Sequence, residues 1–219
     1  MGGCVSGLKS MQTISPDPGV EPVQPPKAGE IIVRPSTDAD APAMLAIYTR
    51  HVQQGQNGME FEPLHADDIK RRRKNMQKHR LPHIVAELDG SVIGYAYAVP
   101  FRKRPAYRYC VKNSIYVHQD HLRAGVGRKL LPALIEACAE AGYRQMIAYV
   151  DSSNGGSLNL HESCGFRRVA CLEGIGFKFG RWYDSVMLQR ALGPGASEPP
   201  PGFTAASRLG IGDISMESD

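Results

Sequence analysis

Three short stretches of the chain carry residues whose types and order could do chemistry. The first spans residues 121–127 (HLRAGVG), between an apolar run that ends at Val117 and a helical pattern that begins near Arg128. A glycine-bearing turn from a strand into a helix points several backbone N–H groups and the positive helix terminus at one place. This arrangement suits a pyrophosphate, so the stretch predicts a phosphate-binding loop, with a plain strand-to-helix turn as the alternative.

The spacing of this loop argues against two common nucleotide-binding motifs. No Lys-Ser/Thr pair ends it, as in a P-loop, and Leu130 stands where a dinucleotide-binding motif has its third glycine. ATP and dinucleotides are therefore poor candidates for its ligand.

Two further blocks follow in the second half of the chain. One runs from Asn154 through Ser157 and His161 to Phe166, and the other covers residues 174–184. With the glycine-bearing loop, and in this order, they resemble the phosphinothricin acetyltransferase family of the GNAT superfamily of acyl-CoA N-acyltransferases. The resemblance covers residues 31–192. It implies an α/β (α+β) fold with a mixed twisted sheet, splayed central strands and helices on both faces.

The resemblance implies that acetyl-CoA is the acetyl donor and that it binds where two central parallel strands separate. The pantetheine arm would follow the strand at residues 115–117, and the pyrophosphate would meet the backbone of the loop. Leu122 replaces the Arg or Gln that begins the superfamily pattern, so weaker binding is expected, with Arg123 as an adjacent cation. The predicted cofactor-binding residues are Ile115, Tyr116, Val117, Arg123, Ala124, Gly125, Val126, Gly127, Arg128, Asn154, Ser157 and His161; helix capping is a second, compatible role for Asn154.

Acetyl transfer to an amine needs a proton acceptor, donors to the developing oxyanion and an acid for the leaving thiolate. By resemblance, His161 is that acid and the main-chain N–H of Val117 is an oxyanion donor; an imidazole has a pKa near 6.5 and exchanges protons near neutrality. Family members commonly read Val-Glu-Asp-Ser-Val-Tyr-Val, with the Glu as base. Here Lys112 stands at the Glu position.

Three explanations of Lys112 stay open. Lys112 could act as the base with a lowered pKa, or another group such as Glu62 or water could take the proton. The third is a protein that binds acetyl-CoA with weak or lost catalysis. A cation at this position could also select an anionic group of the substrate.

The acceptor implied by the resemblance is the α-amine of a small amino-acid-like compound, such as phosphinothricin, methionine sulfoximine or methionine sulfone, which attacks directly. Phe61 and Glu62 match the family's substrate-side loop, and the resemblance places Tyr107, Lys178 and Phe179 near the acceptor entrance. A homodimer, common in the family, would bring the predicted turn at residues 176–182 close to a neighbouring active site.

The elements that must position these residues follow from periodicity and turn signals. Strands are expected at 31–35, 84–88, 91–98, 114–117, 145–150, 166–172 and 183–189, with a tight Asp-Gly turn at residues 89–90. One helix should begin after the caps at residues 36–40 and carry Met44, Leu45, Ile47 and Tyr48 on one side. Others are expected at 66–79, from 128 onward with a kink at Pro132, and at 158–164.

Composition fits one domain. The 219 residues are 42% hydrophobic and 22% charged, with a net charge of +4. The basic run at 70–74 is expected to be a solvated helix face, and nucleic-acid binding is the minor alternative; the run at 102–104 could face an anion.

The five cysteines lack paired metal spacing, so no metal and a reducing, cytoplasmic setting are expected. No apolar stretch is long enough to span a bilayer. Residues 1–30 and 193–219 are rich in Pro, Gly and Ser and are predicted to be disordered tails. Residues 1–6 match an N-myristoylation signal, but Met11 could equally be the start, and no membrane anchoring is expected.

Overall fold

The computed structural model describes residues 29–54 and 64–200. Of the tails predicted at 1–30 and 193–219, residues 1–28 and 201–219 lie outside the described residues, as do the substrate-side residues Phe61 and Glu62. Residues 193–196 form turns. The strands are β1 (Ile32–Pro35), β2 (His83–Leu88), β3 (Ser91–Pro100), β4 (Cys110–Val117), β5 (Gln145–Asp151), β6 (Arg167–Lys178) and β7 (Arg181–Ala191), and the α-helices are α1 (Ala41–Gln54), α2 (Ala66–Lys78), α3 (Val126–Glu140) and α4 (Gly155–Ser163).

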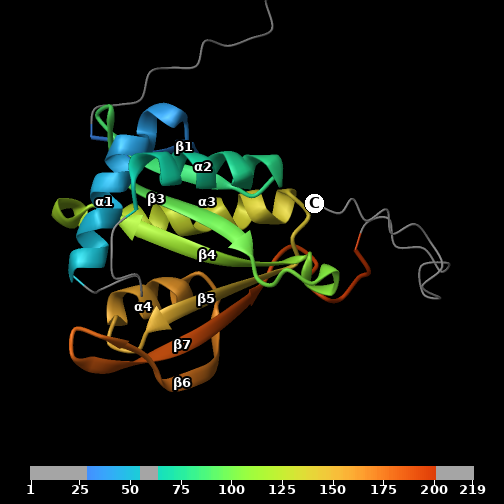
Figure 1. The fold of residues 1–219 in the computed structure, drawn as a ribbon. Helices are drawn as coiled ribbons and strands as arrows, with labels where there is room; N and C mark the ends of the chain where they lie inside the picture. The colour runs from blue at the N-terminus through green and yellow to red at the C-terminus, as the bar shows by residue number, and fades with distance from the viewer. Residues whose placement is uncertain (1–28, 55–63, 201–219) are drawn as a thin grey trace, which may run out of the picture.

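The strands form one mixed sheet in the order β1-β2-β3-β4-β5-β7-β6. All neighbours are antiparallel except β4 and β5, which are parallel and pair only from Cys110 with Gln145 to Lys112 with Ile147. Beyond Lys112 the two strands diverge, as Figure 1 shows. The expected mixed sheet with splayed central strands is confirmed.

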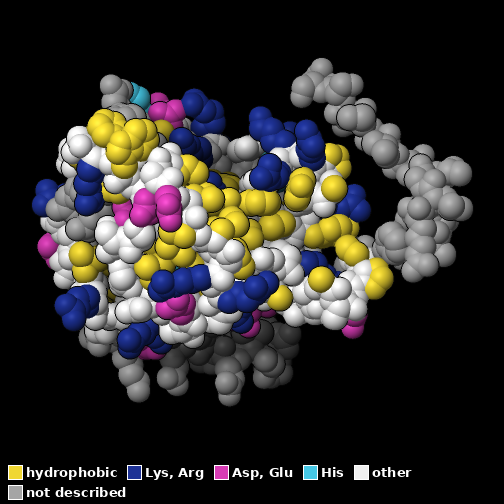
Figure 2. Space-filling view, turned by 90° about the horizontal axis from the view of Figure 1, so that it is seen from below, with side chains coloured by type: hydrophobic (Ala, Val, Ile, Leu, Met, Phe, Trp, Pro, Cys, Tyr) yellow, Lys and Arg dark blue, Asp and Glu magenta, His cyan; other side chains and the backbone are white. Residues whose placement is uncertain are grey.

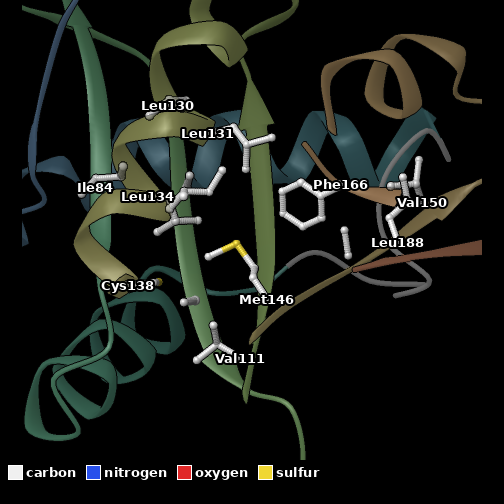
Figure 3. Close-up of a cluster of buried hydrophobic side chains, with 14 of the residues drawn as sticks. Ile84, Val111, Leu130, Leu131, Leu134, Cys138, Met146, Val150, Phe166 and Leu188 are labelled. Atoms are coloured by element: carbon white, nitrogen blue, oxygen red, sulfur yellow. The ribbon is translucent and has the colours of Figure 1, made fainter. Parts of the chain in front are cut away.

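Helices cover both faces of the first half of the sheet. On one face α1 buries Met44, Ile47 and Tyr48 against Val85 of β2 and Tyr116 of β4, as the helical spacing predicted. On the other face α3 buries its leucines against β2, β3 and β4. Figure 3 shows Leu131 and Leu134 of α3 in one cluster with Met146 of β5, Val111 of β4 and Phe166.

Two-residue turns set two of the hairpins. Asp89 and Gly90 both have positive φ, of 47° and 78°, which is the geometry of a tight hairpin turn between β2 and β3. Phe179 and Gly180 repeat it at 51° and 75°. The turn predicted at 176–182 is present but shorter: β6 extends to Lys178 and β7 begins at Arg181, so only two residues connect them.

Two other element boundaries differ from the prediction, because polar residues interrupt the apolar run of a strand and glycines weaken the helical pattern. β4 begins at Cys110 and not at Ser114, since residues 110–113 pair with β3 although Lys112 and Asn113 interrupt the apolar run. α4 begins at Gly155 and not at Leu158, because capping by Asn154 offsets the low helix propensity of the two glycines. α3 continues through Pro132 as one helix.

The basic run at 70–74 is not wholly a solvated face. Arg73 is buried, and its guanidinium donates to the carboxylate of Asp38 and, at 2.9 Å, to the carbonyl of Ser36. Arg71 and Arg72 are exposed. One member of the run therefore fixes α2 to the segment after β1, because its helical position turns it inward.

Candidate active site

The edge of β4 that faces β5 is the starting point of the site. His118 N–H pairs with the carbonyl of Ile93 on β3, so alternate peptide groups along β4 point toward β3 and toward β5. Those of Asn113, Ile115 and Val117 point toward β5, which pairs with β4 only as far as Lys112. The sheet therefore leaves this edge open to an extended ligand that pairs like a strand.

The loop after β4 is shaped for an anion. Arg123 and Gly125 have positive φ, of 63° and 86°, and Gly125 is the N-cap residue of α3. The first hydrogen bond of the helix runs from Lys129 N–H to the carbonyl of Gly125 at 3.2 Å. The N–H groups of Val126, Gly127 and Arg128 precede that bond and take no helical partner. Arg123, Ala124 and Arg128 are exposed beside them.

The start of α3 lies against α4. A Cβ atom at Gly127 would come within 2.8 Å of Leu160 Cδ2, so α4 can pack this closely only because residue 127 has no side chain. Asn154 caps α4, since its side chain accepts the N–H of Ser157 at 3.0 Å. The glycine loop before α3 and the helix that carries His161 are thus neighbours in space.

His161 is buried, with 3% of its surface exposed, and both ring nitrogens have partners. Nδ1 lies 2.8 Å from the carbonyl oxygen of Ser157, and Nε2 lies 3.3 Å from Asn113 Nδ2 on β4. The edge of the ring meets Phe166. Burial lowers the pKa of His161 below its ordinary 6.5, and the bond to the Ser157 carbonyl opposes this shift only in part. The imidazole is therefore neutral at pH 7.

His51 of α1 was missed by the sequence reasoning, because a single histidine in a helix carries no signal. Its Nε2 lies 2.9 Å from the carbonyl oxygen of Val117, at the open edge of β4. Its Nδ1 is buried and has no hydrogen-bond partner in the described part of the chain. Burial lowers the pKa of His51. The ring also lines a pocket of about 160 Å³ between α1 and residues 117–122.

Lys112 is half-buried at the last paired position before β4 and β5 diverge. Its strand neighbours are Val99 and Ile147, and no described residue forms an ion pair or hydrogen bond with its ammonium group. The alternation along β4 places Lys112 on the face that α1 covers, and Asn113 on the face of α3.

The three residues predicted at the acceptor entrance do not lie together within one chain. Lys178 is buried at the end of β6, and its Nζ donates to the carbonyl of Val52 in α1 at 2.9 Å. Phe179 is exposed at the adjacent turn. Tyr107 precedes β4, at the opposite end of the sheet, where Arg102 lies over its ring. The strand register separates these two locations.

The parts of the chain that the structure describes contain no group of three His, Cys, Asp or Glu side chains able to hold a metal ion. Within the same ranges no helix has the length and apolar character needed to cross a membrane.

Comparison with known proteins agrees with this geometry. The model of the acetyltransferase (GNAT) family matches residues 46–166. Phosphinothricin N-acetyltransferase of Alcaligenes faecalis is 44% identical over 169 residues, which cover 77% of this chain and 86% of that protein. L-methionine sulfoximine/L-methionine sulfone acetyltransferase of Pseudomonas aeruginosa is 33% identical over 168 residues, covering 76% and 98%.

A solved structure has the same fold and carries the cofactor. The phosphinothricin acetyltransferase of Sinorhizobium meliloti, in complex with AcCoA, superimposes with a TM-score of 0.77 at 35% identity, covering 80% of this chain and 95% of that one. The chain belongs to the GNAT family of acetyltransferases, in its phosphinothricin acetyltransferase-like group, and is an acetyl-CoA-dependent N-acetyltransferase.

Proposed function

We propose that this enzyme transfers the acetyl group of acetyl-CoA to the α-amine of a small amino-acid-like acceptor by direct attack. The relatives named above act on phosphinothricin and on methionine sulfoximine or sulfone, which are such compounds. The observation that carries the proposal is the buried His161 beside the open edge of β4, at the point where the strands diverge.

The residues at the open edge and the loop fit acetyl-CoA. The pantetheine arm would pair with the peptide groups of Ile115 and the N–H of Val117 at the open edge, and pass Tyr116, Asn154 and Ser157. The pyrophosphate would meet the N–H groups from Arg123 through Ala124, Gly125, Val126 and Gly127 to Arg128. Acetyl-CoA supplies an activated thioester carbonyl at that edge.

The groups around the open edge of β4 would have the following roles in the reaction. The N–H of Val117 would donate to the oxyanion that develops on the thioester carbonyl. His161 would exchange a proton with the reacting groups, as the acid that the leaving thiolate needs. Phe61 and Glu62 would form the acceptor side, together with Phe179 and Lys178 near the end of α1.

The second candidate is an acetyl-CoA-binding protein with weak or lost catalysis. Lys112, half-buried without a partner in the described chain, stands where related enzymes commonly have the carboxylate base. Its ammonium group cannot accept a proton while it is charged.

Thiol release from acetyl-CoA tests both candidates. Phosphinothricin, methionine sulfone, methionine sulfoximine and free amino acids would be assayed between about pH 6 and 10, with wild type, Lys112→Glu and His161→Gln. We expect turnover by wild type and a fall of about 10²- to 10⁴-fold in kcat/KM for His161→Gln. Acetyl-CoA binding without turnover in wild type, and turnover in Lys112→Glu, would establish the second candidate.

We also propose a cytoplasmic homodimer. The described cysteines Cys110, Cys138, Cys164 and Cys171 are all free thiols, which supports a reducing compartment. Large apolar side chains are exposed on β5 to β7 and on the turn between β6 and β7, namely Tyr149, Ile175, Phe177, Phe179 and Trp182. Figure 2 shows hydrophobic side chains gathered on the face of the molecule that is seen from below.

Light scattering tests the dimer. We expect a dimer mass for wild type and a monomer for Trp182→Lys, with Arg102→Glu as a surface control that keeps the dimer. A monomeric wild type at about 10 μM would refute this proposal without affecting the proposed activity.

A further inference from the structure

The partners of His161 determine which of its nitrogens holds the proton. The carbonyl oxygen of Ser157 can only accept a hydrogen bond, so Nδ1, 2.8 Å away, must be the donor. The hydroxyl oxygen of Ser157 lies 3.4 Å from the same nitrogen. In a neutral imidazole the other nitrogen is then an acceptor. His161 is therefore the Nδ1–H tautomer, with a lone pair on Nε2.

Asn113 matches that tautomer. Its Nδ2 amide group donates to Nε2 of His161 at 3.3 Å and to the sulfur of Met146 on β5 at 3.5 Å. The reversed amide would place two acceptors, Oδ1 and Nε2, against each other. Asn113 is 7% exposed, so water competes little for these bonds. It is also the first residue of β4 beyond the last pair with β5.

No charged side chain in the described chain contacts the His161 ring. The ring partners are Asn113, Ser157 and Phe166. Glu162, the next residue of α4, pairs with Arg168, and Lys112 lies on the opposite face of β4. The group that faces Nε2 of His161 is thus a neutral amide. Family members with the common pattern Val-Glu-Asp-Ser-Val-Tyr-Val have an Asp at this position.

We propose that Asn113 is a positioning residue that holds Nε2 of His161 free of a proton, so that this one nitrogen both accepts the proton of the amine and delivers it to the leaving sulfur. The proposal rests on the proposed function. It explains how the enzyme acts although Lys112 has replaced the usual carboxylate. It also explains how His161, which in the resting enzyme carries no proton on Nε2, can serve as an acid.

The proton count balances within one turnover. As the amine nitrogen forms its bond to the acetyl carbon, Nε2 releases the Asn113 amide and its lone pair takes one N–H proton. The ring becomes an imidazolium whose Nδ1–H stays on the carbonyl of Ser157. As the carbon–sulfur bond breaks, the same proton passes from Nε2 to the sulfur, which leaves as the thiol. The amide product and a neutral His161 remain, so an acceptor that enters as the neutral amine, after its ammonium form has lost a proton to solvent, requires no further acid or base.

Nitrogen NMR of the histidine rings tests the tautomer without any turnover. In ¹⁵N-labelled wild type at pH 7.5 we expect the His161 signals of an Nδ1–H ring with unprotonated Nε2, assigned by their loss in His161→Gln. Asn113→Asp, which is nearly isosteric, should protonate Nε2 because its carboxylate can only accept. Asn75→Asp, an exposed change on α2 with the same difference in charge, should leave the His161 signals unchanged.

The pH profile of kcat/KM tests the consequence for catalysis. A carboxylate beside the imidazole favours its charged form, so the acidic limb of Asn113→Asp should move upward by about 1–3 pH units, and that of Asn75→Asp should not move. An Nε2–H ring in wild type, or an acidic limb in Asn113→Asp that coincides with the control, would overturn the inference while leaving the proposed function intact. Absence of turnover by wild type with every amine would overturn both.

Discussion

Lys112 and Asn113 are adjacent in β4, yet they meet different surroundings because successive side chains of a strand lie on opposite faces. Asn113 reaches His161 on the face of α3, whereas Lys112 has no partner among the described residues on the face of α1. The side chains of Lys112 and Asn113, at the divergence of β4 and β5, therefore lie on opposite faces of the sheet. The proton chemistry can stay on the His161 side, and an anionic acceptor group would meet Lys112 on the other.

A single missing side chain also shapes the site. A Cβ atom at Gly94 of β3 would lie 2.9 Å from Val126 Cγ1, 3.1 Å from the Tyr116 carbonyl oxygen and 3.2 Å from Leu130 Cδ1. The backbone oxygen cannot move aside, so Gly94→Ala should push the start of α3 away from the sheet. We expect a loss of about 1–3 kcal/mol in the free energy of unfolding and weaker acetyl-CoA binding.

Urea unfolding and acetyl-CoA titration check this expectation. Gly155→Ala is the matched control, because its Cβ would meet nothing within 4 Å. It should leave stability unchanged or raise it by up to about 1 kcal/mol. Equal stability of the two variants would refute the packing argument.

At the scale of elements, long polar side chains fasten helices to strands. Arg73 ties α2 to the segment after β1, and its bond to Ser36 satisfies a carbonyl of a buried residue. Arg73→Met should leave that carbonyl without its donor and reduce the free energy of unfolding by about 1–3 kcal/mol. Chemical denaturation compares the free energy of unfolding of Arg73→Met with that of Arg71→Met, a control at an exposed residue. A loss of the same size in both variants would contradict the anchoring role.

Lys178 connects the β6–β7 hairpin to α1 across the diverging strands. Its ammonium group donates to the carbonyl of Val52 in the last turn of the helix, where backbone carbonyls lack helical partners and a cation is favourable. Lys178→Met should remove a charged hydrogen bond of about 1.5–3 kcal/mol and loosen the end of α1.

Hydrogen exchange of the α1 amides and denaturation together measure this effect. Arg181→Met, on the exposed side of the same turn, provides the control and should change little. Unaltered protection of α1 in Lys178→Met would show that the hairpin does not support the helix.

At the scale of the whole molecule, buried histidines determine how stability depends on pH. Burial lowers the pKa of His83 to about 4, and burial also lowers the pKa values of His51 and His161. The unfolded chain then binds more protons than the folded one below about pH 6.5, so stability must fall as the pH decreases. For His83 the loss should approach about 3 kcal/mol near pH 4.

Urea unfolding at intervals between about pH 7.5 and 4.5 measures this slope, at about 1.4 kcal/mol per pH unit for each fully titrating histidine. His83→Phe should flatten it, since a phenyl ring retains the stacking on Tyr95 and Tyr97 and cannot titrate. A constant stability down to pH 5 would contradict the prediction. The carboxyl of Asp40 acts only at lower pH, because its bond to Arg34 lowers its pKa to about 2.

Features that depend on neighbouring residues could be predicted from the sequence. The Asp-Gly turn at residues 89–90, the buried stripe of α1, and the glycine loop leading into α3 depend on short-range geometry, and the structure contains all three. The ordered motifs also indicated the family, because they preserve the backbone shapes that a common cofactor requires. The predicted starts of β4 and α4 were wrong, because Lys112 and Asn113 interrupt the apolar run of β4 and glycines weaken the helical pattern of α4.

The contacts between distant segments were decided only by the tertiary structure. Asn113 and His161 are 48 residues apart, His51 and Val117 are 66 apart, and Lys178 and Val52 are 126 apart. Neither the spacing nor the polarity of these residues indicates their partners, because a buried polar side chain is paired by whichever elements the packed core brings beside it. The sequence alone determined the fold family and the glycine loop before α3, and the packing of α1, α4 and the hairpin against diverging strands determined which side chains meet at the open edge of β4.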